Sequence, residues 1–142
     1  MKNVSTHFVR MVVLSDGGLK TVIGGLFALE LYVLSVAAAL AGGADVLEAA
    51  YARSADGTYR FDVTVRHEDA GWEHYADKWQ VLDADGTVLG ERVLFHPHDT
   101  EQPFTRSQSG IEIPIGVQSV VIRAHDKKHG WGGAELTIEL EN

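Results

Sequence analysis

Histidines are the residues of this chain that are best suited to bind a metal. The sequence of 142 residues contains seven, and six of them fall within three short segments. The six are His67, His74, His96, His98, His125 and His129. Each segment holds two of these histidines, with an aspartate or glutamate beside them. Imidazole together with carboxylate binds divalent transition metals. The sequence therefore predicts a histidine-rich metal site, provided that the three segments meet in the folded chain.

Sulfur ligands are missing from the predicted domain. The chain has no cysteine, and its two methionines, Met1 and Met11, precede the domain. Cu(I) thioether sites, blue-copper sites, iron–sulfur clusters and cysteine-based zinc sites are therefore excluded. Imidazole and carboxylate suit Zn²⁺, Cu²⁺, Fe²⁺, Ni²⁺ or Mn²⁺, and the choice among these metals stays open.

The elements that would position these histidines are β-strands. Apolar residues alternate with polar ones over Tyr59–Arg66 and again over 134–141, which is typical of strands with one buried face. Asp56-Gly57 and Asp85-Gly86 suit tight hairpin turns. Further strands are expected at residues 46–52, 75–83, 88–95, 104–113 and 117–124. About seven strands predict an all-β, immunoglobulin-like antiparallel sandwich.

The direction of successive strands brings the three histidine segments together. If the strand at 59–66 runs toward one end, the strands at 88–95 and 117–124 reach the same end, and each leads into histidines. The turns at the opposite end contain no histidine. Functional residues of a sandwich gather in the loops at one end, so this asymmetry favours a site built from three loops.

Each segment alone also fits a purely structural role. The acidic loop at 67–74 can simply be solvated, with Asp69 and Glu73 as further ligands or as hydrogen-bond partners of the histidines. Pro97 can end a strand, and Asp126 can cap backbone groups of a turn. The convergence of the loops is what favours a metal site.

The N-terminal segment follows a different pattern. Residues 21–44 form an apolar run that is preceded by basic residues and ends in small ones, as in a secretory signal peptide. Cleavage is expected after Ala41 or Ala44. The run of about 20 residues is also long enough for an uncleaved membrane anchor. We therefore expect a signal peptide or anchor at 1–44 and an exported domain, periplasmic or extracellular, at 45–142.

A set of short motifs spans most of residues 59–140. They are His67, GWEHYADKWQVLDADG, GERVLF and His129-Gly130-Trp131. This set resembles the iron domain of desulfoferrodoxins and superoxide reductases, an immunoglobulin-like sandwich in which loop histidines and a late cysteine bind non-haem iron. The resemblance implies His67, His74 and His129 as ligands. Asp126, with His125 beside it, stands where that family has its cysteine, so superoxide reduction is not carried over.

Two functions from different classes follow. The first is an exported protein that binds a divalent transition metal, in metal handling or oxidative-stress defence. Its expected ligands are His67, His74 and His129, with His125, His96, His98 and Asp126 as further candidates. The alternative is a non-enzymatic envelope module that binds a glycan, a peptide or a protein through Trp72, Tyr75 and Trp131. No catalytic residue is assigned in either case.

Two further observations bear on the partners and the relatives of the chain. Its 20 acidic residues against 12 basic ones give a net charge of −8, which repels nucleic acid. The stretch HPHDTEQPFTRSQSG, residues 96–110, also looks like small exported bacterial proteins without an assigned function.

Overall fold

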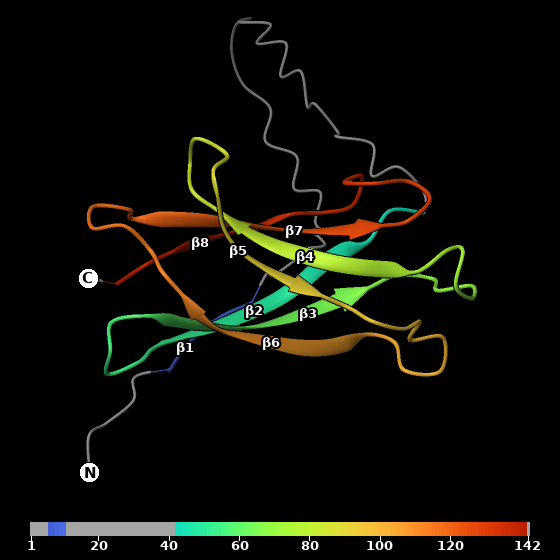
Figure 1. The fold of residues 1–142 in the computed structure, drawn as a ribbon, viewed down its shortest axis with the longest axis horizontal. Coiled ribbons are helices and arrows are strands. Elements are labelled where there is room, and N and C mark those ends of the chain that lie inside the picture. Colours follow the sequence, from blue (N-terminus) through green and yellow to red (C-terminus); the bar gives the residue numbers. More distant parts are fainter. Residues whose placement is uncertain (1–5, 11–41, 142) are drawn as a thin grey trace, which may run out of the picture.

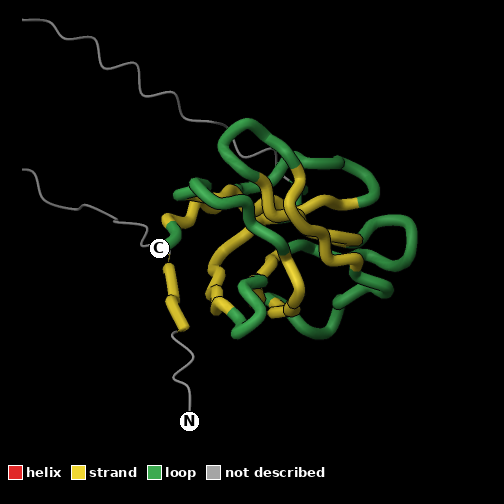
Figure 2. The backbone as a smooth tube through the Cα atoms, turned by 60° about the vertical axis from the view of Figure 1, so that its left-hand side comes forward, coloured by secondary structure: helices red, strands yellow, loops and turns green. Residues whose placement is uncertain are grey.

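Alternating apolar and polar side chains build two antiparallel sheets, which Figures 1 and 2 show from two directions. The computed structural model describes residues 6–10 and 42–141. The strands are β1 (Thr6–Arg10), β2 (Asp45–Arg53), β3 (Tyr59–Arg66), β4 (Ala76–Leu82), β5 (Val88–Val93), β6 (Phe104–Ile111), β7 (Ser119–Asp126) and β8 (Leu136–Glu139). One sheet has the order β1-β2-β3-β6 and the other the order β5-β4-β7-β8. The predicted all-β sandwich is therefore confirmed, with the strands β2 to β8 in the predicted domain.

Most of the predicted signal peptide or anchor lies outside the described residues. Of this segment the structure describes 6–10 and 42–44. β1 pairs antiparallel with β2, from Thr6 opposite Ala52 to Arg10 opposite Glu48. None of the described residues forms a helix that is long and apolar enough to cross a membrane.

The core lies between the inner faces of the two sheets. Every second residue of β3, from Tyr59 to Val65, is buried, and so is every second residue of β7, from Val120 to Asp126. Trp79 of β4 is fully buried as well. Burial of one large apolar side chain contributes roughly 1.5–3 kcal/mol to stability. In β3 and β7 the period-two pattern therefore fixes which face of the strand points inward.

β7 ends later than the sequence pattern predicts. We expected a strand over 117–124, whereas it runs from Ser119 to Asp126. Its pairing with β4 continues to the end, with His125 opposite Lys78 and Asp126 opposite Ala76. His125 and Asp126 are therefore strand residues with opposite orientations, and not members of the following loop.

The three histidine segments lie at one end of the sandwich. Figure 1 shows the β3–β4, β5–β6 and β7–β8 loops at the right-hand end, and the β2–β3, β4–β5 and β6–β7 turns at the left-hand end. The chain also enters β2 at the right-hand end, because β2 and β3 are antiparallel. Four segments that are far apart in the sequence therefore meet there.

Candidate metal centre

Two residues of the candidate metal centre continue the inward-facing rows of their strands. His67 follows Val65 by two positions, just beyond β3, and Asp126 follows Ala124 by two positions at the end of β7. Because alternate residues of a strand share a face, both side chains point into the sandwich. His67 is 3% exposed and Asp126 is 0% exposed. The two sheets thus each contribute one polar group at the end of the core.

The other two residues of the centre come from turns. In the β3–β4 loop, Ala70 donates its N–H to the carbonyl of His74 at 2.7 Å, and His74 donates to the carbonyl of Gly71 at 3.2 Å. After β7, the Asp126 carboxylate accepts the backbone N–H of Lys128 at 2.9 Å and of His129 at 2.7 Å. These bonds hold each turn, so the histidine rings are placed by ordered backbone.

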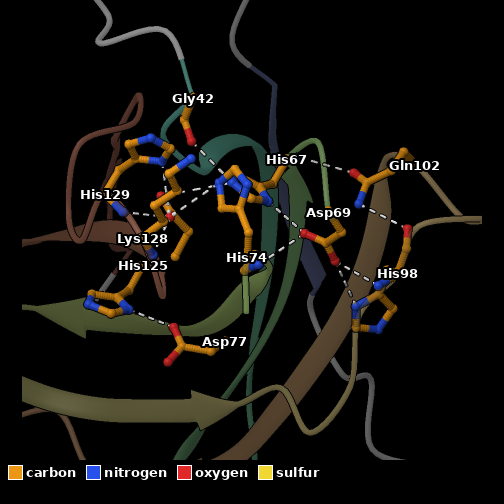
Figure 3. Close-up of polar contacts among 12 residues, drawn as sticks. Gly42, His67, Asp69, His74, Asp77, His98, Gln102, His125, Lys128 and His129 are labelled. Atoms are coloured by element: carbon orange, nitrogen blue, oxygen red, sulfur yellow. Dashed lines mark hydrogen bonds and ion pairs between the residues drawn. The ribbon is translucent and has the colours of Figure 1, made fainter. Parts of the chain in front are cut away.

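Figure 3 shows the side chains of His67, His74 and His129 close together, and Asp126 belongs to the same group of potential metal ligands. One potential ligand atom from each of these four residues lies within 4.8 Å of the other three. Asp126 Oδ1 is 3.2 Å from His129 Nδ1 and 3.7 Å from His74 Nε2, and Asp126 Oδ2 is 3.8 Å from His67 Nε2. Three imidazoles and one carboxylate are a common ligand set for zinc and other divalent transition metals.

Two atoms of the centre are buried without a partner. His74 Nε2 and Asp126 Oδ2 make no hydrogen bond to any residue that the structure describes. A buried polar atom without a partner costs about 1–3 kcal/mol, and more when the group is charged. A metal bound between these atoms would remove that cost. The donor set and the two unpartnered atoms therefore fit a divalent metal ion.

The Asp69 carboxylate orients the ring of His67. Asp69 Oδ1 lies 2.6 Å from His67 Nδ1 and also accepts the N–H of Ala76 at 3.0 Å. A proton on Nδ1 leaves Nε2 unprotonated and able to bind a metal; this nitrogen lies 3.8 Å from Asp126 Oδ2. Carboxylates bonded to the far nitrogen of a ligating histidine are typical of metal sites, because they fix the tautomer and raise the basicity of the ring.

The surroundings of His74 lower the pKa of its imidazole. Burial of the ring is the largest cause, repulsion from His67 adds to it, and attraction to Asp126 acts in the opposite direction. A lowered pKa keeps the ring neutral at neutral pH. The neutral ring is also the form that binds a metal.

The remaining candidate histidines lie outside this group of four. His125 faces the outer side of the sheet, where its Nδ1 is 2.6 Å from Asp77 Oδ1 and its ring contacts Trp131 at a centroid distance of 4.7 Å. His96 is exposed, and its ring lies 4.5 Å from that of His98. The structure thus brings together four of the seven predicted ligand residues.

His98 is buried beside the centre without joining it. Its ring stacks on Phe104 at a centroid distance of 3.9 Å, and neither ring nitrogen has a hydrogen-bond partner in the described part of the chain. Its backbone N–H donates to Asp69 Oδ2 at 2.6 Å. Asp69 therefore links the β5–β6 loop to His67, a connection visible in Figure 3.

A cavity of about 520 Å³ opens beside the centre. His67 and His74 line one part of it, and Gly42, Arg66 and Glu68 line other parts. The side chain of His129 is 30% exposed and that of His74 is 21% exposed. Water and small ions can therefore reach the centre from solvent.

Sequence reasoning did not single out two contacts of this region. Gly42, just before β2, places its carbonyl oxygen 3.1 Å from His67 Nε2. Asp77 holds His125 on the outer face. The pairing register of β4 shifts between Ala76 and Lys78, so Ala76 and Trp79 are both buried although they are three positions apart. Strand parity could have predicted the outward orientation of Asp77 only if this bulge had been known.

Comparison with known proteins gives one relative. The chain is 48% identical over 82 residues to a protein of Halomicrobium mukohataei that carries the description "Putative lipoprotein". The match covers 58% of this chain and 40% of that protein, so the chain spans less than half of the relative's length. No family model matches the chain, and no solved structure matches it.

Proposed function

We propose that this protein is an exported metal-binding protein whose site consists of His67, His74, His129 and Asp126. The metal is a divalent transition metal such as Zn²⁺, Cu²⁺ or Fe²⁺, because the donors are imidazole and carboxylate without sulfur. The role that suits such a site is metal handling or defence against oxidative stress.

The observation that carries the proposal is the packing of unsatisfied donors. Four ligand atoms lie within 4.8 Å, and the two that are buried without a partner, His74 Nε2 and Asp126 Oδ2, face this group. Most buried polar atoms of a protein have a hydrogen-bond partner, and a metal would supply one to both of these atoms. Asp69 bonds to the far nitrogen of His67, as expected when the near nitrogen binds a metal.

Two observations support export. The apolar run at residues 21–44 has the order of a secretory signal or an anchor. The relative that matches over 82 residues is described as a lipoprotein, which is a class of exported and membrane-attached proteins. We therefore propose that the site functions on the outer side of the cytoplasmic membrane.

The resemblance to the iron domain of desulfoferrodoxins enters the proposal only in part. Matching motif positions put His67, His74 and His129 in the ligand set. The position of the family's thiolate is occupied by Asp126, a hard oxygen donor that does not tune iron as sulfur does. We therefore propose the metal site and no superoxide reduction.

A titration of metal-free protein with Zn²⁺ tests the proposal. The wild-type protein is expected to bind about one Zn²⁺ per chain, and His74→Ala is expected to bind none at the same concentrations, since it removes one of the two unpartnered donors. His96→Ala is the matched control, because His96 is exposed and outside the group. A wild-type protein that takes up none of Zn²⁺, Cu²⁺ and Fe²⁺ would refute the proposal.

Exposed aromatic residues favour a second candidate function, recognition of a glycan, peptide or envelope protein. Trp72 is 62% exposed next to the centre, and its ring packs against Tyr75 at a centroid distance of 6.0 Å. Aromatic side chains with one free face are frequent in binding surfaces. This function requires no metal, so retention of partner binding by metal-free protein would distinguish it from the first.

A further inference from the structure

We infer that the main-chain carbonyl oxygen of Gly42 is a fifth ligand of the metal, in addition to the four side chains of the centre. This inference rests on the proposed function. The oxygen lies 3.1 Å from His67 Nε2, and in the view of Figure 3 Gly42 lies between His129 and His67. Gly42 thus approaches the centre from the segment that precedes β2, on the side away from Asp69.

The distance between these two atoms fits two ligands of one metal. With metal–ligand bonds of about 2.0–2.2 Å and angles between 90° and 110°, neighbouring donor atoms are roughly 2.8–3.6 Å apart. The separation of Asp126 Oδ1 and His129 Nδ1, 3.2 Å, falls in the same range. A hydrogen bond from His67 Nε2 to the carbonyl would also have this length. A metal bound to Nε2 instead of that proton would lie off the line between the two atoms, within bonding distance of both.

Glycine is required for this approach. Gly42 has φ = +110°, a left-handed conformation that other residues rarely adopt. A Cβ atom at this position would lie 2.8 Å from Cε1 of His129, closer than real contacts allow. The backbone can therefore reach the two ligand histidines only because residue 42 has no side chain.

The neighbouring residues hold the carbonyl in place. A Cβ on Gly43 would lie 2.6 Å from backbone atoms of Gly132 and Gly133, so the two backbone segments are in direct contact. Ala134 donates its N–H to Asp45 Oδ1 at 2.8 Å and accepts a hydrogen bond from the N–H of Val46, also at 2.8 Å. The position of Gly42 therefore follows from packing on the β7–β8 loop.

A main-chain ligand has two chemical consequences. Three imidazole nitrogens and two oxygens form a five-donor set, which an ion such as Zn²⁺ or Cu²⁺ accepts and which contains no sulfur. The metal would also tie the segment that leads into β2 to the β3–β4 and β7–β8 loops. Metal binding is then expected to stabilise the contact between this segment and the two loops.

Isotope labelling tests the ligand directly. Protein is produced with glycine that carries ¹³C at the carbonyl, loaded with Cu²⁺ and examined by electron–nuclear double resonance. We expect a ¹³C coupling beside the nitrogen couplings of the imidazoles. Gly42→Ala should abolish the ¹³C coupling, since alanine is unlabelled. Gly57→Ala should retain it, because Gly57 also has a positive φ, +88°, but has nothing within 4 Å of its Cβ position.

The outcomes separate this inference from the proposed function. Imidazole couplings without a ¹³C coupling in the wild-type protein, or a ¹³C coupling that persists in Gly42→Ala, would overturn the carbonyl ligand and leave the four-residue site intact. A wild-type protein that binds no Cu²⁺ would overturn both. As a second readout, Gly42→Ala is expected to weaken Zn²⁺ affinity at least about tenfold relative to Gly57→Ala, and equal affinities would count against the inference.

Discussion

His125 and His129 lie four residues apart, yet they face different surroundings. His125 points to the outer side of β7, where it bonds to Asp77 and contacts Trp131. His129 turns back toward Asp126 and packs against the ring of His74, at a centroid distance of 4.9 Å. Strand parity and one tight turn account for the difference, so position within a histidine-rich segment does not by itself make a metal ligand.

The same contrast exists between two aspartate–histidine pairs. Asp69 bonds to His67 on the inner side, and Asp77 bonds to His125 on the outer side, each at 2.6 Å. Both inner side chains are at most 1% exposed, whereas those of the outer pair are 23–24% exposed. Two pairs with the same geometry are therefore expected to differ in their effect on metal binding.

Removal of one histidine from each side should give the largest difference. His129→Ala is expected to weaken Zn²⁺ affinity by more than about a hundredfold, because a ligand is lost. His125→Ala should change the affinity by less than about threefold. Competition with a chelator of known affinity measures both variants. Similar losses in the two variants would mean that the inner and outer histidines do not differ in the way the structure indicates.

Substitution of the two aspartates should give a smaller difference of the same sign. Asp69→Asn is expected to lower Zn²⁺ affinity by about 10–100-fold, the usual effect of losing the carboxylate behind a ligating histidine. Asp77→Asn is the matched control and should leave the affinity unchanged. The urea unfolding curves of the metal-free variants show whether either change has disturbed the fold. Comparable affinities in two folded variants would contradict the orienting role of Asp69.

The smallest expected effect concerns the pH dependence of stability. Burial lowers the pKa of His98 below its ordinary value of 6.5, Arg106 and His96 add to this effect, and Asp69 and Glu101 oppose it. The unfolded chain therefore binds the proton more readily than the folded one. Stability should be complete above pH 6.5 and decrease below it, by at most about 1.4 kcal/mol per pH unit for this one group.

Urea unfolding of metal-free protein between pH 8 and pH 5 measures this dependence. His98→Phe keeps a ring to stack on Phe104 and cannot be protonated, so its free energy of unfolding should fall less steeply toward pH 5 than that of the wild-type protein. His74, whose pKa is also lowered, contributes equally to both curves. Parallel curves would show that His98 does not contribute.

The fold could be predicted from the sequence because alternation is a local signal. The pattern at Tyr59–Arg66 gave the bounds of β3, and the direction of the strands gave the convergence of the three loops. The same parity places His67 on the inner face. The strand predicted from the alternation ends at Ala124, whereas β7 continues to Asp126. The prediction therefore did not place Asp126 on the inner face and His125 on the outer face. Two more residues of strand decide that orientation.

Other parts of the site depend on contacts that the sequence does not encode locally. Gly42 reaches His67 only because the chain before β2 packs on the β7–β8 loop, more than 80 positions away in the sequence, as the bond from Ala134 to Asp45 shows. Contacts of this kind depend on the packing of the whole core, so the spacing of residues in the sequence does not predict them.

The metal content of the protein as purified from the exported fraction tests the central claim most directly. Elemental analysis of the wild-type protein, without added metal, should find about one divalent transition metal ion per chain, and the His74→Ala, His129→Ala double variant should contain none. A folded wild-type protein without metal, which also remains metal-free after incubation with Zn²⁺, Cu²⁺ and Fe²⁺, would contradict the claim that these donors form a metal site.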